Sequence, residues 1–151
     1  MIEFNFLKNL IDYRLNNSSG QALPLMPPVK DWSLPLKNFI SDNGLDKQPD
    51  AATLLLIGLA PHAVPQLFDH AIQDKLKESG DFTEIGGVLG KNFLVCLATG
   101  QTAVFLFAGY DVNRRVEVEQ LFWSNNAFAK RKILWLEDLP SGEPTISGKI
   151  I

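Results

Sequence analysis

The spacing of hydrophobic residues predicts a chain built mostly of helices. In residues 3–15, apolar side chains recur at intervals of three and four, which is the period of an amphipathic helix. The repeating positions are Phe4, Leu7, Ile11 and Leu15. The polar tract NNSSG that follows is expected to end this helix.

Three further helices are predicted downstream. A short one covers residues 36–41, and the apolar stretch PDAATLLLIGLA predicts a buried helix with Pro49 at its start. The next helix covers residues 64–80, with Pro65 in its first turn and Gly80 at its end. Its predicted apolar face consists of Val64, Leu67, Phe68, Ala71 and Ile72.

A proline-rich connector joins the first two predicted helices. Proline fixes φ and lacks an N–H group, so residues 21–35 are expected to be extended rather than helical. The connector is nevertheless too apolar for a free linker. We expect its hydrophobic residues to pack along the domain, or else to dock on a partner: Leu25, Met26, Val29, Trp32 and Leu34.

The C-terminal half predicts a strand followed by two capped helices. Residues 93–97 form an apolar, β-like run. Thr99 can cap a helix from about Gly100 to Ala108, and Gly109 is a plausible stop. Asp111 can cap the next helix, which continues to about residue 123.

A hairpin is predicted to close the chain. Residues 132–137 and 145–151 are β-like runs, and the loop DLPSGEP between them suits antiparallel strands. From residue 64 the order is helix, strand, helix, helix, strand, wing, strand, so we predict an α+β, mostly helical, winged-helix-like domain in residues 49–151. Residues 1–48 would add a helix, the connector and a short helix that pack on this domain.

The charges change the function that such a fold first suggests. A winged helix commonly binds DNA through its second helix and wing. Here that helix carries Arg114 and Arg115 together with three carboxylates, and the wing carries two carboxylates and no basic residue. Lys and Arg total 14 against 17 Asp and Glu, giving a net charge of −3. Phosphate would meet repulsion at both elements, so protein partners are favoured over nucleic acid or membrane.

The glycine-rich stretch GGVLGKN resembles a phosphate loop only superficially. A P-loop needs four residues between its glycines, and three separate Gly86 from Gly90. Asn92 stands where a Ser or Thr should follow the lysine, and a strand-like run follows where a helix should begin. We therefore expect a glycine-rich turn that introduces a strand, with no bound cofactor.

Neither metal binding nor catalysis has a recognisable set of residues. His62 and His70 lie eight positions apart, a spacing that forms no zinc site. His62 is expected to order the break between two helices, and His70 to face solvent. Cys96 lies in an apolar run and is expected to be a buried thiol. The sequence shows no nucleophile elbow, secretory leader or transmembrane run, so a cytoplasmic, non-enzymatic protein is predicted.

Several short motifs resemble the region preceding the ATPase module in AAA ATPases associated with contractile, phage-tail-like injection systems, found largely in Bacteroidetes and other Gram-negative bacteria. The resemblance covers about two-thirds of the chain, from LLLIGLAPHAVPQLFD onward. It includes a leucine-rich helix ending in APH, a GG-x-x-G turn, a strand-to-helix corner, an AGDD-like segment and a closing GEP-x-x-SG segment. The matching positions are His62, Gly86, Gly87, Gly90, Thr99, Gly100, Thr102, Gly109, Asp111, Gly142 and Pro144.

This chain departs from the family pattern at one corner. Ala98 replaces a proline, Gln101 a glutamate, and Tyr110 the first aspartate of AGDD. These changes weaken any role that depends on charge there. The resemblance implies that the matching residues are structural, and that the nucleotide-binding motifs would lie beyond Ile151.

The sequence thus predicts a non-catalytic N-terminal domain of an AAA ATPase, used to recognise a partner or to position the ATPase on a tail-like particle. Its expected partners are proteins, including a C-terminal AAA module and particle components. Candidate contact residues are Leu25, Met26, Trp32, Arg114 and Arg115. A small winged-helix transcription regulator is the alternative, and an enzyme acting on a small molecule ranks third.

Overall fold

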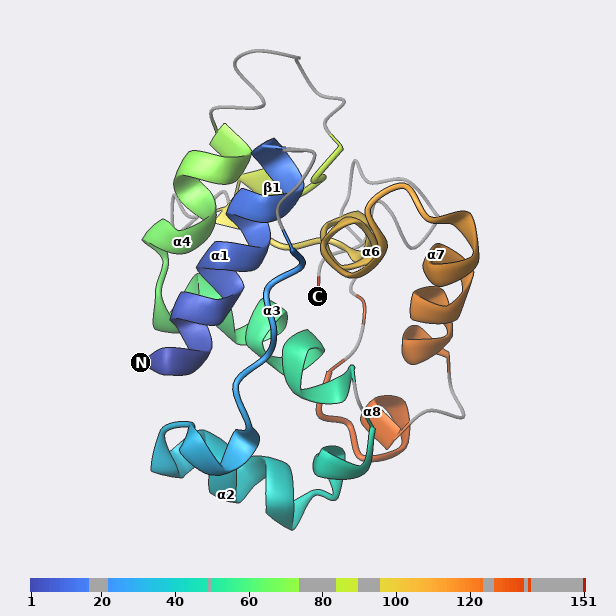
Figure 1. Cartoon of the computed structure of the whole chain (residues 1–151). Helices are drawn as coiled ribbons and strands as arrows, with labels where there is room; N and C mark the ends of the chain where they lie inside the picture. Colours follow the sequence, from blue (N-terminus) through green and yellow to red (C-terminus); the bar gives the residue numbers. More distant parts are fainter. Residues whose placement is uncertain are drawn as a thin grey trace.

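A computed structural model describes residues 1–16, 22–48, 50–73, 84–89, 96–123, 127–134, 136 and 151, and it is dominated by helices (Figure 1). The α-helices are α1 (Ile2–Asn16), α2 (Leu34–Asp42), α3 (Ala51–Ala63), α4 (Gln66–Phe68), α6 (Gly100–Ala108), α7 (Val112–Glu119) and α8 (Ala127–Lys130). Two short strands, β1 (Val88–Leu89) and β2 (Cys96–Leu97), pair antiparallel.

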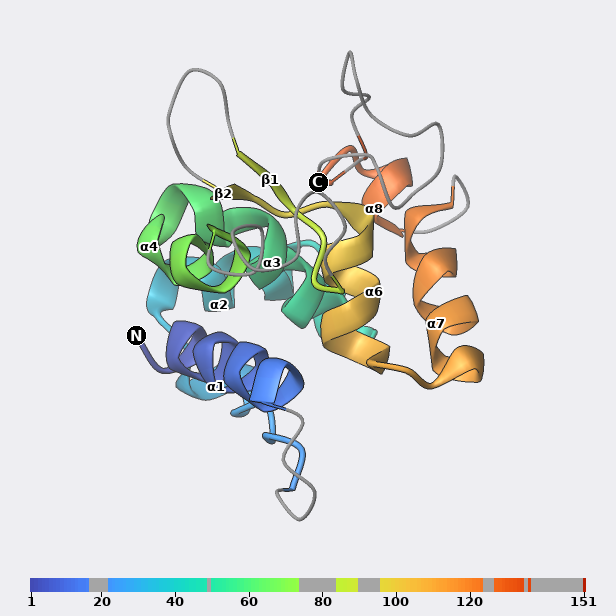
Figure 2. The same ribbon diagram turned by 90° about the horizontal axis from the view of Figure 1, so that it is seen from above.

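Helix α6 lies between α1 and α7 in both views of the ribbon (Figures 1 and 2). Helix α1 packs on α3 and α6, while α7 packs on α6 at the edge of the molecule. Helix α3 is apolar on nearly all sides, as its sequence predicted, because it crosses the centre of the core. The core includes Leu7, Ile40, Leu56, Ile57, Phe68, Phe105 and Leu106.

The predicted amphipathic first helix is confirmed as α1. Its buried face includes Phe4, Leu7 and Ile11, which are three of the four positions that set its period. The predicted short helix is confirmed as α2, which begins two residues earlier than expected, with Pro35 in its first turn. The turn before residue 45 uses Gly44 at φ 65°, which lies in the left-handed region.

The apolar connector divides into a packed part and an exposed part. Residues 22–28 have no regular secondary structure, and a single 3₁₀ turn follows at Val29–Asp31. Trp32 is buried, and its Nε1 donates a hydrogen bond to the Pro27 carbonyl at 2.9 Å. Met26 and Val29 are partly buried against the core. The expected packing on the domain is therefore correct for these three residues.

Leu25 and Leu34 do not pack on the domain as expected. The exposed fraction of Leu25 is 90% and that of Leu34 is 61%. A short extended segment exposes alternate side chains, so Leu25 points outward between neighbours that are more buried. A partner contact by Leu25 stays a prediction.

The break between α3 and α4 differs from the predicted one. Helix α3 continues through His62 to Ala63, and the Val64 N–H donates to the Ala60 carbonyl at 2.8 Å. His62 is exposed on the last turn, so the backbone of Val64 and the following proline order the break instead. Helix α4 passes into a π-helical turn, Asp69–Gln73, and residues 74–80 of the predicted helix lie outside the described residues.

A strand that the sequence did not predict follows the glycine-rich turn. Gly86 and Gly87 have φ values of 66° and 90°, and β1 follows directly. In the pairing with β2, Val88 lies opposite Leu97 and Leu89 opposite Cys96. The predicted strand at 93–97 is confirmed at its last two residues, while Gly90 and residues 91–95 lie outside the described part.

Helices α6 and α7 begin at the predicted caps. The Thr99 hydroxyl accepts from the Thr102 N–H at 3.4 Å, and the Thr99 N–H donates to the Thr102 hydroxyl at 3.0 Å. This reciprocal capping box satisfies two donors at the start of α6. Gly109 ends α6, and the Asp111 carboxylate accepts from the Arg114 N–H at 3.1 Å to start α7.

The predicted closing hairpin is not established. Residues 132–134 form a turn and an irregular segment after α8 rather than a strand, and Lys132 has φ 53°. Residues 137–150, which include Gly142 and Pro144, lie outside the described residues. The Ile151 N–H donates to the Ala98 carbonyl at 3.0 Å. The fold is mostly helical, and its winged-helix order stays a prediction.

None of the described helices alone has the length and hydropathy to cross a bilayer. Helix α3 taken together with residues 66–73 reaches that length, but the two parts are bent by 105°.

Candidate functional site

Three arginines converge on the C-terminal end of α6. Arg14 donates from Nε to the Leu106 carbonyl at 3.0 Å and from Nη2 to the Phe107 carbonyl at 2.8 Å. Arg115 donates from Nη1 to the Gly109 carbonyl at 2.7 Å. The last carbonyls of a helix lack partners within it and carry partial negative charge, so both guanidinium groups stabilise this end of α6.

Arg114 pairs with carboxylates instead. Its Nη2 lies 2.6 Å from Asp50 Oδ1 and its Nη1 lies 3.2 Å from Glu117 Oε2, while its guanidinium lies over the Phe107 ring, 5.9 Å from the centroid. The hydrogen bond to Asp50 raises the pKa of Arg114 from its ordinary value. Arg114 and Arg115 were both predicted to contact a partner, but their guanidinium groups form ion pairs and hydrogen bonds within the protein.

The outward face of α7 is apolar with an acidic border. Val112 and Val116 are exposed on this face, and exposed Trp123 follows the 3₁₀ turn Gln120–Phe122 beyond the end of α7. We call these three residues the α7 stripe. The exposed side chain of Glu119 lies beside the stripe, and exposed Asp111 lies at its N-terminal end. The opposite face is anchored in the protein by buried Val118. The sequence predicted the Asp111 cap but not this exposure, and α7 ends at Glu119 rather than near residue 123 because a 3₁₀ turn, Gln120–Phe122, follows it.

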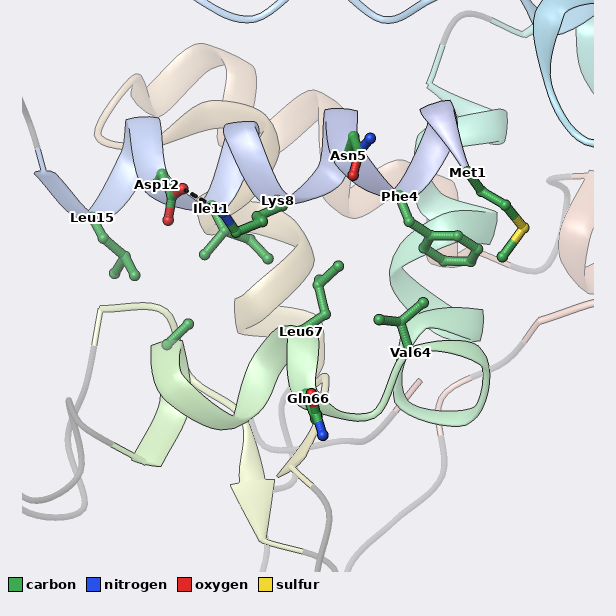
Figure 3. Close-up of a pocket in the computed structure, with 11 residues that line it drawn as sticks. Met1, Phe4, Asn5, Lys8, Ile11, Asp12, Leu15, Val64, Gln66 and Leu67 are labelled. Carbon is green, nitrogen blue, oxygen red and sulfur yellow. Dashed lines mark ion pairs between the residues drawn. The ribbon is translucent and has the colours of Figure 1, made fainter.

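A groove of about 510 Å³ opens between α1 and α4 (Figure 3). Phe4 and Leu15 point into it from α1, and they are faced by Val64 at the end of α3 and by Leu67 of α4, while Gln66 points away. Its charged lining residues, Lys8 and Asp12, are exposed and lie 3.9 Å apart, which gives a weak ion pair. The groove offers apolar surface and contains no acid–base pair or nucleophile among its lining residues.

A smaller cavity of about 160 Å³ lies beneath the connector. Leu23, Pro24 and Met26 form its connector side, and the Asp50–Arg114 ion pair forms a charged wall. The Thr53 hydroxyl lies 3.3 Å from the Met26 sulfur. This contact explains why Met26, a predicted partner residue, is half-buried in the protein.

The glycine-rich turn is tied to the start of α6. The Gly87 N–H donates to the Thr99 hydroxyl at 3.2 Å, and Gln101 Nε2 donates to the Glu84 carbonyl at 2.8 Å. Arg115 Nη2 then donates to Gln101 Oε1 at 3.1 Å, which connects the turn to α7. Sequence reasoning placed the glycines in a structural turn but did not find Glu84, whose contacts are not visible in any local pattern.

The chemistry of Cys96 is suppressed by its surroundings. The thiol is fully buried, and burial, with further effects from Asp69, raises its pKa to about 11. Asp69 Oδ1 also accepts from the Cys96 N–H at 3.4 Å. The predicted buried thiol is confirmed. In the part of the chain that the structure describes, no group of three or more His, Cys, Asp or Glu side chains could hold a metal ion.

Comparisons with protein-family models, with curated proteins and with solved structures each found no match for this chain. The function must therefore be argued from its own surfaces.

Proposed function

We propose that this chain is a non-catalytic protein-recognition domain, used to position an AAA ATPase module, with components of a tail-like particle as further partners. The observation that carries the recognition role is the α7 stripe, because two valines on a capped helix and a tryptophan just beyond its end are exposed. Contiguous exposed apolar surface of this kind is typical of contact sites. The link to an AAA module rests on the resemblance of the glycine turn and the α6 corner.

The alternative, a DNA-binding regulator, has less support. A recognition helix needs basic side chains that are free to reach phosphates or bases. The two arginines of α7 are held by Asp50, Glu117 and the Gly109 carbonyl, and its exposed carboxylates would repel phosphate. Leu25 and the α1–α4 groove supply further apolar surface, which also suits a protein partner.

Site-specific photo-crosslinking in the source cells tests the proposed function. A photoreactive amino acid is placed at Val116, at Leu25 or at exposed Lys47, which serves as the control position on a polar surface. We expect discrete protein adducts from Val116 or Leu25, with an AAA ATPase among the proteins identified, and none from Lys47. Absence of adducts at both apolar positions would overturn the recognition role.

Fluorescence anisotropy with mixed-sequence duplex DNA separates the alternative. We expect no binding at low salt. Binding that weakens steeply as salt is added would instead favour the regulator, since released counterions produce that dependence.

A further inference from the structure

We infer that the α7 stripe docks an amphipathic helical segment of a protein partner, whose apolar side chains are flanked by lysine or arginine. This inference rests on the proposed function and names the chemistry of its partner.

The spacing places the two valines of the stripe on one face of α7, because Val116 follows Val112 by four residues. Trp123 lies beyond the end of α7, directly after the 3₁₀ turn Gln120–Phe122. The exposed fractions of Val112, Val116 and Trp123 are 71%, 55% and 54%. Helix α7 contacts α6 through the opposite face, and both ribbon views show α7 at the edge of the molecule (Figures 1 and 2).

The charges bordering the stripe are negative. Glu119 lies along its side and Asp111 at its end, and both are exposed. The positive charges of α7 face inward: Arg114 meets Asp50 and Glu117, and Arg115 meets the Gly109 carbonyl. An incoming segment with lysine or arginine beside its apolar face would find complementary charge, which favours encounter and register.

The acidic border also decides between possible occupants. A second copy of this chain docked stripe to stripe would bring its own acidic border against this one, and like charges across an interface are unfavourable. Nucleic acid is disfavoured by the same carboxylates. An amphipathic partner helix can set apolar side chains at i, i+4 and i+7 against the two valines and Trp123 while its flanking lysines or arginines meet the carboxylates.

Two synthetic peptides of about 14 residues, the length of four helical turns, test the inference on the full chain. Both carry leucines on one helical face, flanked by lysines in one peptide and by glutamates in the other. Binding is measured by calorimetry and by the change in tryptophan fluorescence, which should report contact with Trp123. We expect the lysine peptide to bind at least about tenfold more tightly, with affinity that falls as salt is added.

Three variants locate the binding. Val116→Asp should weaken binding of the lysine peptide by about tenfold or more, since it places a charge at the centre of the apolar contact. Ile2→Asp, at the exposed start of α1, should leave the affinity unchanged. Glu119→Lys should shift the preference toward the glutamate peptide. Because Val116 and Glu119 are exposed, circular dichroism should show all three variants folded.

Several results would overturn the inference. These are equal binding of the two peptides, no binding of the lysine peptide, an equal loss of affinity on Ile2→Asp, or self-association of the native chain that Val116→Asp abolishes. If the peptides fail while photo-crosslinking still yields protein adducts, the inferred partner chemistry is wrong and the recognition role stands. If the crosslinks fail as well, both are wrong.

Discussion

At Gly87 the backbone and a neighbouring side chain leave no room for a Cβ atom. The residue has φ 90°, and an added Cβ would overlap Ile72 Cδ1. We expect Gly87→Ala to lower the free energy of unfolding by roughly 2–5 kcal/mol, through left-handed strain and overpacking. The matched control is Gly44→Ala, at φ 65°, where the nearest atom to a Cβ is Arg131 Nη2 at 3.9 Å. Gly44→Ala should lower the free energy of unfolding by about 1–2 kcal/mol, from backbone strain alone.

Urea denaturation of both glycine variants measures the difference. If both variants lose the same free energy of unfolding, then Ile72 moves aside without energetic cost and does not pack closely against the turn.

The Cys96 thiol makes stability depend on alkaline pH. Its pKa is raised from 9.0 to about 11 in the folded protein, so the folded state holds the proton more tightly than the unfolded chain does. Stabilisation by the neutral thiol is fully present below pH 9 and is lost as the pH rises toward 11. Urea unfolding across this range should show falling stability, and Cys96→Ala should reduce the slope. An unchanged slope would contradict the assignment to Cys96.

Between elements, Glu3 connects α1 to the start of α2. Its side chain is buried, and its Oε1 accepts from the Ser33 N–H at 3.3 Å, where Ser33 caps α2. Burial opposes ionisation, but hydrogen bonds from Ser33 and from the Glu3 backbone outweigh it and lower the pKa of this carboxyl. The charge also complements the positive end of the α2 dipole.

We expect Glu3→Gln to destabilise the protein by about 1–2 kcal/mol at neutral pH, because the charged acceptor at the α2 terminus is lost. The folded pKa lies below the ordinary 4.5, so native Glu3 stabilises above that pH and ceases to do so as the pH falls through the folded value. Chemical denaturation as a function of pH should therefore show the two proteins converging in acid. A gap that persists there would indicate a steric effect instead.

The success of sequence prediction also varied by element, for a physical reason. The bounds of α6 follow from Thr99 and Gly109, which act within one turn of the helix ends, so local reasoning predicted them. The π-helical turn after α4 could not be predicted, because nothing in the spacing of its apolar residues departs from helical period. Strand β1 was missed because two residues between a turn and a loop carry no periodicity.

The candidate site was predicted less well than the fold. Arg114 and Arg115 were predicted to contact a partner because they are the basic residues of the candidate recognition helix. Asp50 pairs with Arg114 across 64 positions of sequence, and no local sequence pattern predicts a partner at that separation. The shared exposure of Val112 and Val116 follows from helical spacing only after Val118 is known to lie on the buried side, and Trp123 lies beyond the helix.

On the scale of the whole molecule, Trp32 of the connector ties residues 1–48 to the rest of the protein. Trp32 belongs to the same core cluster as α3 and α6 residues, with 4% of its surface exposed. We expect Trp32→Ala to cost about 3–5 kcal/mol and Leu25→Ala less than about 0.5 kcal/mol. Both variants should unfold in one transition, observed together by fluorescence and circular dichroism. Separate transitions would mean that residues 1–48 form an independent unit.

The hydrogen bonds from Arg14 to the C-terminal end of α6 affect the order in which the protein folds. Its bonds to the Leu106 and Phe107 carbonyls span 92 and 93 positions of sequence, so the chain must close a very long loop before they form. Contacts of such separation are costly to establish early and tend to be absent from the transition state. The two hydrogen bonds then slow unfolding. Removing them by substitution of Arg14 would shorten the lifetime of the native state while leaving the folding rate almost unchanged.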